Sequence, residues 1–281
     1  SRTSVSLDGR FVVVANRQSN TVTMIAAQEE DCVDSNNNNQ IDTSQNNNDL
    51  LAWGTDECVI WQTELEEIGD DIQAGPRALT WDAGELNQQT CKVENASVWV
   101  GYRDVAQNLA HISRLNGETG AIEDTIDING WTANWGPYGA AMDPDGDLWF
   151  TGLRRNLYRV NTDDLSVDTW APPQNGQFYG MSVDPEGKSW MGGCSGPVSV
   201  FDPADESYNT IAGTQACHRG VAPDGEGNIW VASNGPCGLV QVDAETETLV
   251  KFHNFAQCST PVGVSVDIDG DVWMVDQAGW A

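Results

Sequence analysis

The sequence predicts an all-β fold, a β-propeller of about six or seven four-stranded blades. One phrase recurs along the chain: a short apolar run, a turn with Asp and Gly, and a short run centred on Trp, as in residues 139–152 (GAAMDPDGDLWFTG). The tryptophans of the four clearest copies are 41, 40 and 43 residues apart, at Trp149, Trp190, Trp230 and Trp273. A period of about 40 residues with several short strands per repeat is typical of propeller blades.

Each copy is expected to begin with the innermost strand of a blade. The apolar run forms that strand, the Asp-Gly pair supplies the positive φ of a tight hairpin, and the Trp-centred run forms the second strand. Residues 4–14 and 76–101 hold two more divergent copies, of which the second has a longer first hairpin. Within a single predicted domain, residues 1–281, the blades begin near residues 4, 76, 137, 178, 218 and 261.

The interval between the first two copies is too long for one blade, which predicts an insertion at residues 29–61 in the first blade. The last copy ends at Trp280 and Ala281, directly after its second strand. Because a propeller has to close its ring, we expect the chain to be part of a longer polypeptide.

The composition indicates an acidic protein. Asp and Glu number 42 against 13 Lys and Arg, for a formal charge of −29. Such a surface repels nucleic acid and anionic membranes, so neither is an expected partner. No apolar run reaches about 18 residues, and the sequence therefore predicts no membrane span.

Six of the seven cysteines are placed to form disulfides. Cys194 and Cys237 follow the second strands of consecutive blades, and Cys217 and Cys258 precede the next first strands. These loops lie on the same propeller face, which favours Cys194–Cys217 and Cys237–Cys258 over unpaired thiols. Cys32 and Cys58 bracket the insertion, and Cys91 is left over. Paired cysteines predict a secreted, periplasmic or cell-surface protein.

The insertion contains the pattern of a calcium loop. Oxygen ligands at alternate positions are predicted from the side chains of Asp34, Asn36, Asn38 and Asp42 and from the backbone carbonyl of Gln40. Asn39 stands where Gly is usual, and Asn also tolerates the left-handed conformation. Gln45 stands where a bidentate Glu is usual, so another acidic residue has to compensate. A flexible Asn-rich loop is the alternative.

Residues 136–151 (GPYGAAMDPDGDLWFT) resemble the repeat of the streptogramin B lyase (virginiamycin B lyase) propeller family, which is also similar to NHL-type propellers. The resemblance covers residues 137–276 well and the first two blades loosely. It is specific for the fold and less so for the activity, because many exported bacterial proteins with this repeat have no known lyase chemistry.

The lyase resemblance implies a magnesium-assisted elimination that opens a cyclic depsipeptide with His and Glu residues on one ring face. His218 occupies the family's His position, and Asp276 stands where the strand after Trp273 has Glu in the family. No blade has both His and Glu, so His218 as base and Asp276 as metal ligand would have to act across blades. The alternative is a structural His218 that hydrogen-bonds a neighbouring loop.

Five aromatic residues fall on loops that enter the third and fourth blades, and they are expected on one face near the central opening: Trp131, Trp135, Tyr138, Phe178 and Tyr179. Their rings could stack on a sugar or an apolar ligand, or pack to fill the opening.

Three functions are compatible with this sequence. The first is an exported binding module, stabilised by calcium and disulfides, that presents one face to a protein or glycan. The second is a lyase with His218 as base and magnesium as cofactor. The third is a self-assembling subunit of a surface layer or filament, joined to its neighbours through the unclosed last blade and Cys91. We favour the first over enzymatic activity, with a metal-assisted lyase kept as the enzymatic alternative.

Overall fold

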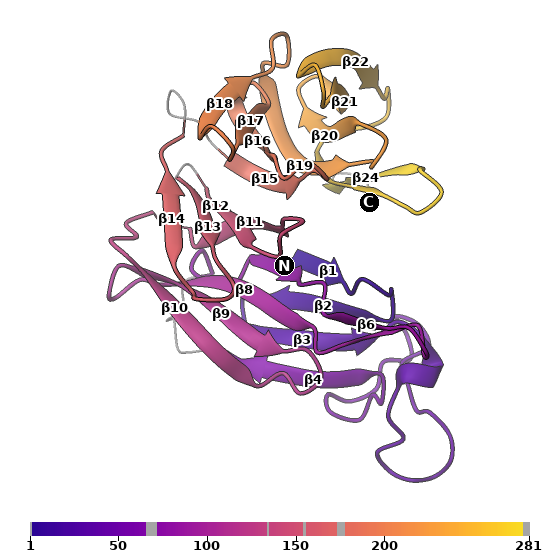
Figure 1. The fold of residues 1–281 in the computed structure, drawn as a ribbon. Helices are drawn as coiled ribbons and strands as arrows, with labels where there is room; N and C mark the ends of the chain where they lie inside the picture. The colour runs from indigo at the N-terminus through magenta and orange to yellow at the C-terminus, as the bar shows by residue number, and fades with distance from the viewer. Residues whose placement is uncertain (1, 66–71, 134, 154–155, 173–177, 278–281) are drawn as a thin grey trace. The chain divides into compact units, whose positions relative to one another are not determined.

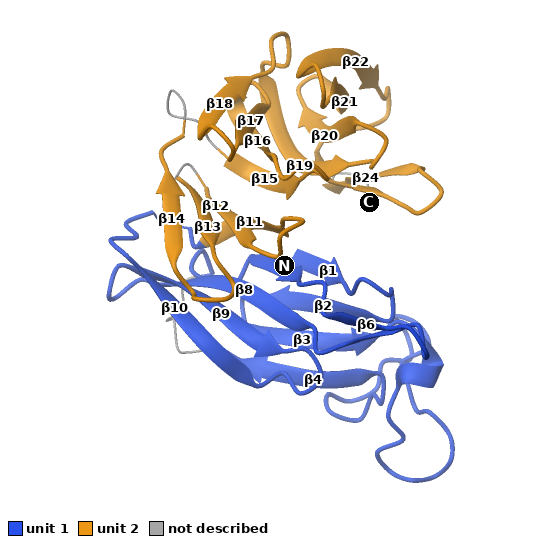
Figure 2. Cartoon of the chain, viewed as in Figure 1, with its two compact units in different colours: residues 1–136 blue, residues 137–281 orange. Residues whose placement is uncertain are grey.

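The computed structural model describes residues 2–65, 72–133, 135–153, 156–172 and 178–277 (Figure 1). The chain forms two compact units, Ser1–Gly136 and Pro137–Ala281 (Figure 2). In the described ranges the only helix is the short 3-10 helix η1 (Glu29–Asp31), and the other elements are strands. The all-β prediction is therefore confirmed. The predicted end of the last copy, Trp280 and Ala281, lies outside the described residues.

Unit 1 is built around two antiparallel sheets. The first has the order β1 (Arg2–Val5), β2 (Phe11–Asn16), β3 (Thr21–Ala26) and β4 (Val59–Glu64). The second has the order β10 (Ile122–Asn129), β9 (Leu109–Asn116), β8 (Ser97–Asp104) and β5 (Ala78–Trp81). The insertion joins β3 to β4 and begins with η1, and the longer hairpin between β5 and β8 folds into a ribbon of β6 (Glu85–Asn87) and β7 (Lys92–Glu94).

Unit 2 repeats the same four-stranded arrangement. Its first sheet contains β11 (Pro137–Met142), β12 (Leu148–Gly152), β13 (Leu157–Val160) and β14 (Val167–Trp170). The next contains β15 (Phe178–Val183), β16 (Ser189–Gly196), β17 (Ser199–Asp202) and β18 (Ser207–Thr210). A third contains β19 (Ala216–Pro223), β20 (Asn228–Asn234), β21 (Cys237–Asp243) and β22 (Thr248–Asn254), and it meets the second through a short β16–β19 pairing. β23 (Pro261–Val266) pairs with β24 (Val272–Asp276).

The recurring Asp and Trp of the sequence phrase form one hydrogen-bonded hairpin. In the β15–β16 hairpin, the Asp184 carboxylate accepts the backbone N–H groups of Glu186 and Lys188 at 3.1 and 2.9 Å and the Trp190 indole N–H at 2.7 Å. The same three bonds form at Asp143, Asp224 and Asp267. The turn glycine has positive φ in all four hairpins, at Gly146, Gly187, Gly227 and Gly270. These segments are hairpin turns, as predicted.

Two of the second-strand tryptophans, Trp149 and Trp190, fill the space between neighbouring sheets of unit 2. Trp149 is buried in a cluster with Phe178, Met191 and Phe201 of the following sheet. Trp190 is buried with Val221 and other aliphatic residues of the sheet that begins with β19. Burial of such a side chain contributes about 1.5–3 kcal/mol, so these contacts hold successive sheets together.

Glycines allow the first strands of successive sheets in unit 2 to approach closely. A Cβ atom on Gly180 of β15 would lie 2.1 Å from the Arg219 carbonyl oxygen of β19. A Cβ atom on Gly220 of β19 would lie 2.8 Å from the Val264 backbone nitrogen of β23. The first-strand glycines Gly180 and Gly220 are therefore required by backbone packing between blades, whereas a Cβ atom on Gly263 would meet only the Val275 side chain, at 3.8 Å.

Candidate functional site

The insertion forms an ordered loop whose polar side chains converge. The Asn36 and Asn38 side-chain amides both donate to Asp42 Oδ2, at 2.9 and 3.1 Å, so three of the five predicted calcium ligands lie beside one another. Asp34 accepts the backbone N–H groups of Asn38 and Asn39 at 3.1 and 2.9 Å. Asn39 has φ +64°, the left-handed conformation predicted for the position where Gly is usual.

Glu57 organises this loop, and the sequence analysis missed it. Its carboxylate is only 4 % exposed and accepts the backbone N–H groups of Ser35, Asn36 and Asp42 at 2.8, 3.2 and 2.9 Å. The hydrogen bond from the Asp42 backbone holds the pKa of Glu57 below its ordinary value of 4.5. The available signal was its position directly before Cys58, at the root of the insertion.

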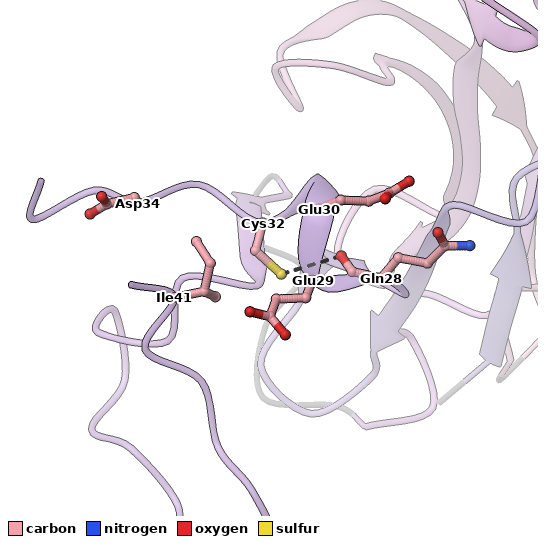
Figure 3. A pocket seen from close by; sticks show the side chains of 6 residues that line it. All are labelled: Gln28, Glu29, Glu30, Cys32, Asp34 and Ile41. Carbon is pink, nitrogen blue, oxygen red and sulfur yellow. Dashed lines mark hydrogen bonds between the residues drawn. The ribbon is translucent and has the colours of Figure 1, made fainter. Parts of the chain in front are cut away.

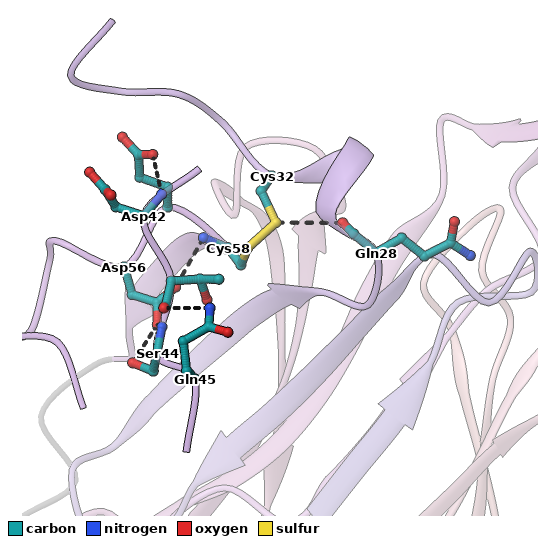
Figure 4. Close-up of a disulfide and its surroundings, with 9 residues drawn as sticks. Gln28, Cys32, Asp42, Ser44, Gln45, Asp56 and Cys58 are labelled. Atoms are coloured by element: carbon teal, nitrogen blue, oxygen red, sulfur yellow. Dashed lines mark hydrogen bonds between the residues drawn. A yellow bond between two sulfur atoms is a disulfide. The ribbon is translucent and has the colours of Figure 1, made fainter. Parts of the chain in front are cut away.

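The root of the insertion is closed by the Cys32–Cys58 disulfide (Figure 4). Beside it, Asp56 accepts the backbone N–H and the hydroxyl of Ser44 at 3.0 and 2.7 Å. Burial alone would raise the pKa of Asp56, but these hydrogen bonds bring it below its ordinary value. Asp31, Asp49 and Asp56 are the acidic residues that could compensate for Gln45. Of these, Asp56 is bonded by Ser44 and Asp31 by Arg10.

An open groove of about 620 Å³ runs along the insertion between η1 and the loop (Figure 3). It is lined by Gln28, Glu29, Glu30, Cys32, Asp34 and Ile41. Cys32 Sγ lies 3.5 Å from the Gln28 carbonyl oxygen, and this is a contact without a proton because the sulfur is in the disulfide. Three of the six lining residues are acidic, which suits a cation better than an anion.

The other two predicted disulfides also form. Cys194 pairs with Cys217 where β16 meets β19, and Cys237 pairs with Cys258. Cys91 is a free, exposed thiol at the ribbon that precedes β8. No helix in the described ranges is long and apolar enough to cross a membrane.

A β-bulge is repeated at the start of each first strand in unit 2. The residue that loses its ladder partner is Tyr138 in β11, Tyr179 in β15, Arg219 with Gly220 in β19, and Val262 in β23. A bulge turns a side chain out of the ordinary alternation of a strand. Sequence reasoning selected both tyrosines but missed Arg219, whose signal was its position before the repeated Gly.

These bulged side chains touch from one sheet to the next. The Tyr138 and Tyr179 rings meet edge to face with centroids 4.7 Å apart, and the Arg219 guanidinium lies 5.1 Å from the Tyr179 ring centroid. With its amide oriented for hydrogen bonding, Asn234 accepts from Arg219 Nε at 3.1 Å and donates to the Pro261 carbonyl at 2.6 Å. We call Tyr138, Tyr179 and Arg219 the inner-strand strip.

The remaining predicted face aromatics are partly or fully packed, as is Tyr138 of the strip, which is 5 % exposed. Phe178 is 2 % exposed and belongs to the core of unit 2. In unit 1, Trp131 is buried and its indole N–H donates to the Trp135 carbonyl at 2.7 Å. Trp135 is half-buried under the Arg77 guanidinium, 4.2 Å from the ring centroid. Phe178 and Trp131 therefore serve packing in this structure.

His218 has a structural environment. It is fully buried on β19, and its Nε2 hydrogen-bonds the Thr214 carbonyl, while Nδ1 has no partner among the described residues. Burial lowers the pKa of His218, although the Thr214 bond opposes that shift. Of the two roles considered for His218, catalytic base and structural residue, this environment favours the structural one, in which a neutral imidazole hydrogen-bonds a neighbouring loop.

Asp276 ends β24 and caps the loop before β23. Its carboxylate accepts the backbone N–H groups of Ser259 and Thr260 at 2.7 and 2.8 Å. Among the described residues, the one group of three close ligand atoms joins Asp276 to Cys237 and Cys258. Because those sulfurs form a disulfide, the group offers a single carboxylate and does not resemble a magnesium site.

The arrangement of the sheets defines a protein of the β-propeller class. Each four-stranded antiparallel sheet begins with its inner strand, and neighbouring sheets pack face to face through Trp and meet along glycine-containing first strands. Within that class, the chain has the fold of the streptogramin B lyases. Virginiamycin B lyase from Staphylococcus aureus matches with a TM-score of 0.66 and 14 % identity over 98 % of this chain and 76 % of that one. A catalytically inactive form of that enzyme with quinupristin matches with a TM-score of 0.66 and 15 % identity, covering 98 % of this chain and 77 % of that one.

A streptogramin B lyase structure matches similarly, with a TM-score of 0.65 and 14 % identity over 98 % of this chain and 75 % of that one. No protein-family model matches the sequence, and neither does any curated protein. At this identity the likeness establishes the fold, and the function has to be argued from the residues of this chain.

Proposed function

We propose that this protein is an exported β-propeller that binds a protein or glycan partner through the inner-strand strip of unit 2. The supporting observation is the repeated bulge, which brings Tyr138, Tyr179 and Arg219 from three successive first strands into contact. Tyr138 is only 5 % exposed and packs under Tyr179, so Tyr179 and Arg219 are the strip residues that a partner would reach. Tyr and Arg are enriched at the energetic centres of interfaces, since each combines apolar area with a polar group. Aromatic rings also stack on sugars.

Export is supported by the three disulfides, which persist in oxidising compartments. A net charge of −29 suits a protein in salt-containing surroundings, where counter-ions screen repulsion. Both features agree with a secreted, periplasmic or cell-surface location.

Calcium binding by the insertion is the second part of the proposal. Asp34, Asn36, Asn38 and Asp42 supply hard oxygen donors, and the Gln40 carbonyl adds another, which leaves positions for water in a shell of about six to eight oxygens. The closeness of Asn36 and Asn38 to Asp42 supports the fit, because turning each side-chain amide so that its oxygen replaces the N–H group facing Asp42 would place three oxygen atoms around a common point. Calcium would stiffen the insertion and offset its negative charge.

The calcium proposal is tested by titrating chelator-treated protein with calcium chloride in a calorimeter. We expect a single ion per chain, weaker binding of magnesium, and a melting temperature that falls on chelation, since ligand at about 100 times Kd stabilises by about 2.7 kcal/mol. Asp34→Ala and Asp42→Ala should abolish the binding. Asp145→Ala, in an exposed hairpin turn, should leave it unchanged. Equal heats for all four proteins would reject the site.

The partner proposal is tested on arrays of glycans and of exported proteins from the source organism. Tyr179→Ala and Arg219→Ala should each weaken a selected interaction by about tenfold or more, which corresponds to about 1.4 kcal/mol. Lys251→Ala, on the exposed outer strand β22, is the matched control and should bind normally. Equal binding by all variants would exclude the strip as the contact.

The two other functions are less well supported. The lyase hypothesis requires a proton acceptor that a substrate can reach, and His218 is fully buried with Nε2 engaged at Thr214. The assembly hypothesis predicts particles larger than one chain, in which the exposed Cys91 links two chains as a disulfide-bonded dimer that reductant separates. Light scattering and non-reducing gels on the purified chain would decide between such assemblies and a single-chain particle.

A further inference from the structure

An open groove of about 380 Å³ lies on one face of the first sheet of unit 1, apart from the calcium loop and the inner-strand strip. Its lining residues come from β2, β3 and β4, from the turn between β2 and β3, and from the insertion. All of these segments belong to unit 1, so the groove is complete within one unit.

The floor of the groove is the face of the sheet that points away from the core of unit 1. Val14 stands opposite Thr23, and Thr23 stands opposite Gln62, so these three form one row across β2, β3 and β4. Their strand neighbours Val13 and Met24 belong to the hydrophobic core. Because side chains alternate between the two faces of a sheet, the row lies on the groove side.

Two carboxamide side chains flank Thr23 on this floor. Asn16 Nδ2 and Gln62 Nε2 both donate to Thr23 Oγ1, at 2.8 and 3.0 Å. The carbonyl oxygens of these two amides accept no hydrogen bond from the described residues, and Asn16 is half-exposed while Gln62 is exposed. The groove therefore presents two positioned acceptors beside apolar side chains, an arrangement that suits the hydroxyl groups of a ligand.

Trp53 is the wall residue that the insertion supplies. It occupies a turn in which the Thr55 backbone N–H donates to the Ala52 carbonyl at 3.0 Å, and Gly54 has φ +81°, as a type II turn requires. The turn positions the indole at the groove, yet the residue is 68 % exposed. An exposed aromatic ring beside a polar floor offers a flat apolar surface on which the C–H face of a sugar can stack.

The absence of charge completes the description of the ligand. None of the eight described residues that line the groove is charged, although the chain has 42 acidic residues. Small-ligand sites commonly have volumes of about 300–1,000 Å³, so this groove accommodates a mono- or disaccharide unit. We propose that it binds a neutral saccharide, with one sugar ring on Trp53 and hydroxyl groups that donate to Asn16 and Gln62. The site is independent of the partner surface proposed for unit 2.

The test uses the methyl glycosides of glucose, galactose, mannose and N-acetylglucosamine, with glucuronate and galacturonate as anionic probes. The indole N–H signals of the ¹⁵N-labelled protein report binding, and Trp53→Ala identifies the signal of Trp53. At least one neutral glycoside should shift that signal saturably, with a Kd on the order of 1 mM. Both uronates should bind at least about tenfold more weakly than the best neutral glycoside, because the groove lacks a cation and the chain is acidic.

The variants separate stacking from hydrogen bonding, with the backbone amide signal of Thr23 as the readout. Trp53→Ala should weaken binding by about tenfold or more, whereas Trp53→Tyr, which keeps an aromatic face, should lose less than about threefold. Gln62→Leu, which keeps the size of the side chain but removes its amide, should lose about fivefold.

Two controls keep the result decisive. Trp273→Ala removes a tryptophan of similar exposure, 61 %, in unit 2 and should bind the glycosides as the parent protein does. Tyr179→Ala should also bind them normally, so failure of the strip and failure of this site are distinguishable. The proposal is overturned if no glycoside shifts the Trp53 signal saturably, if the uronates bind as tightly, or if Trp53→Ala binds normally. A Trp53 signal that shifts with protein concentration alone would show that a second copy of the chain covers the groove, which would also overturn it.

Discussion

Asp184 illustrates how one side chain sets the local structure of a whole hairpin. Its carboxylate is buried and accepts three N–H groups, including that of the fully buried Trp190. Because the spacing from Asp to Trp is the same in the four copies of unit 2, the sequence phrase specifies both the turn and the direction of the tryptophan ring. The repeat is thus defined by a hydrogen-bonding requirement as well as by apolar character.

Asp184→Ala should lower the free energy of unfolding by about 2–3 kcal/mol, because it leaves buried donors without an acceptor. Asp267→Ala removes the equivalent carboxylate in an exposed hairpin, where Trp273 is 61 % exposed, and should cost less than about 1 kcal/mol. Urea unfolding of both variants measures the difference. Equal losses would show that burial does not determine the strength of this motif.

The pH dependence of stability tests the environment of His218. Burial lowers its pKa below the ordinary value of 6.5, so the folded protein binds the proton less tightly than the unfolded chain. Its contribution to stability is therefore complete above about pH 6.5 and is lost as the pH falls toward the lower folded-state pKa. Relative to His218→Gln, the parent protein should lose up to about 1.4 kcal/mol per pH unit below that point.

This comparison uses urea unfolding of both chains from about pH 5.5 to 8, the range in which histidine titrates. The carboxylates are common to the two proteins, so their contributions cancel in the difference. Parallel stability curves would mean that His218 keeps an ordinary pKa and is accessible to water, which would revive its candidacy as a base.

At the scale of elements, the insertion is an independent addition to the first sheet. β3 and β4 pair directly, with Met24 opposite Trp61, and the disulfide closes the loop at its root. The order of the loop therefore depends on three local features: the disulfide, the Glu57 carboxylate and the converging Asp and Asn side chains.

Replacing both Cys32 and Cys58 by Ser should expose residues 33–57 to proteolysis and weaken calcium binding by about tenfold, since the loop has to be ordered at the expense of binding energy. Unfolding of the sheets should change much less. The matched control is the pair Cys194→Ser and Cys217→Ser, which should leave calcium binding intact. Limited proteolysis with and without calcium measures the effect, and an unchanged cleavage pattern would contradict it.

At the scale of the molecule, the way sheets associate within unit 2 depends on close backbone contact. Gly180→Ala would place a Cβ atom 2.1 Å from the Arg219 carbonyl oxygen, so β15 and β19 would have to separate. We expect a loss of about 3 kcal/mol or more in the free energy of unfolding. Gly196→Ala, where no atom lies within 4 Å of the added carbon, should change stability little. Similar melting temperatures for the two variants would refute this account.

Several features could be predicted from the sequence because they depend on local order. The all-β class, the first strands at Pro137, Phe178 and Pro261, the hairpin turns and the Cys194–Cys217 and Cys237–Cys258 pairs follow from a repeat whose period sets the spacing of each strand. The left-handed Asn39 follows from the residue types allowed at that loop position. The number of blades and the bound calcium stay predictions.

Other features depend on contacts between segments far apart in the chain, and only the tertiary structure decided them. Whether an aromatic side chain faces solvent or the core depends on the sheet packed against it, so Phe178 is buried while Tyr179, one residue later, is half-exposed on a bulge. The Glu57 anchor and the groove beside Trp53 likewise arise where the insertion folds back on its blade. The sequence by itself determined the repeat, because backbone hydrogen bonding and turn geometry are local. Tertiary packing decided which side chains remain available for binding, because burial is set by neighbours that sequence distance does not reveal.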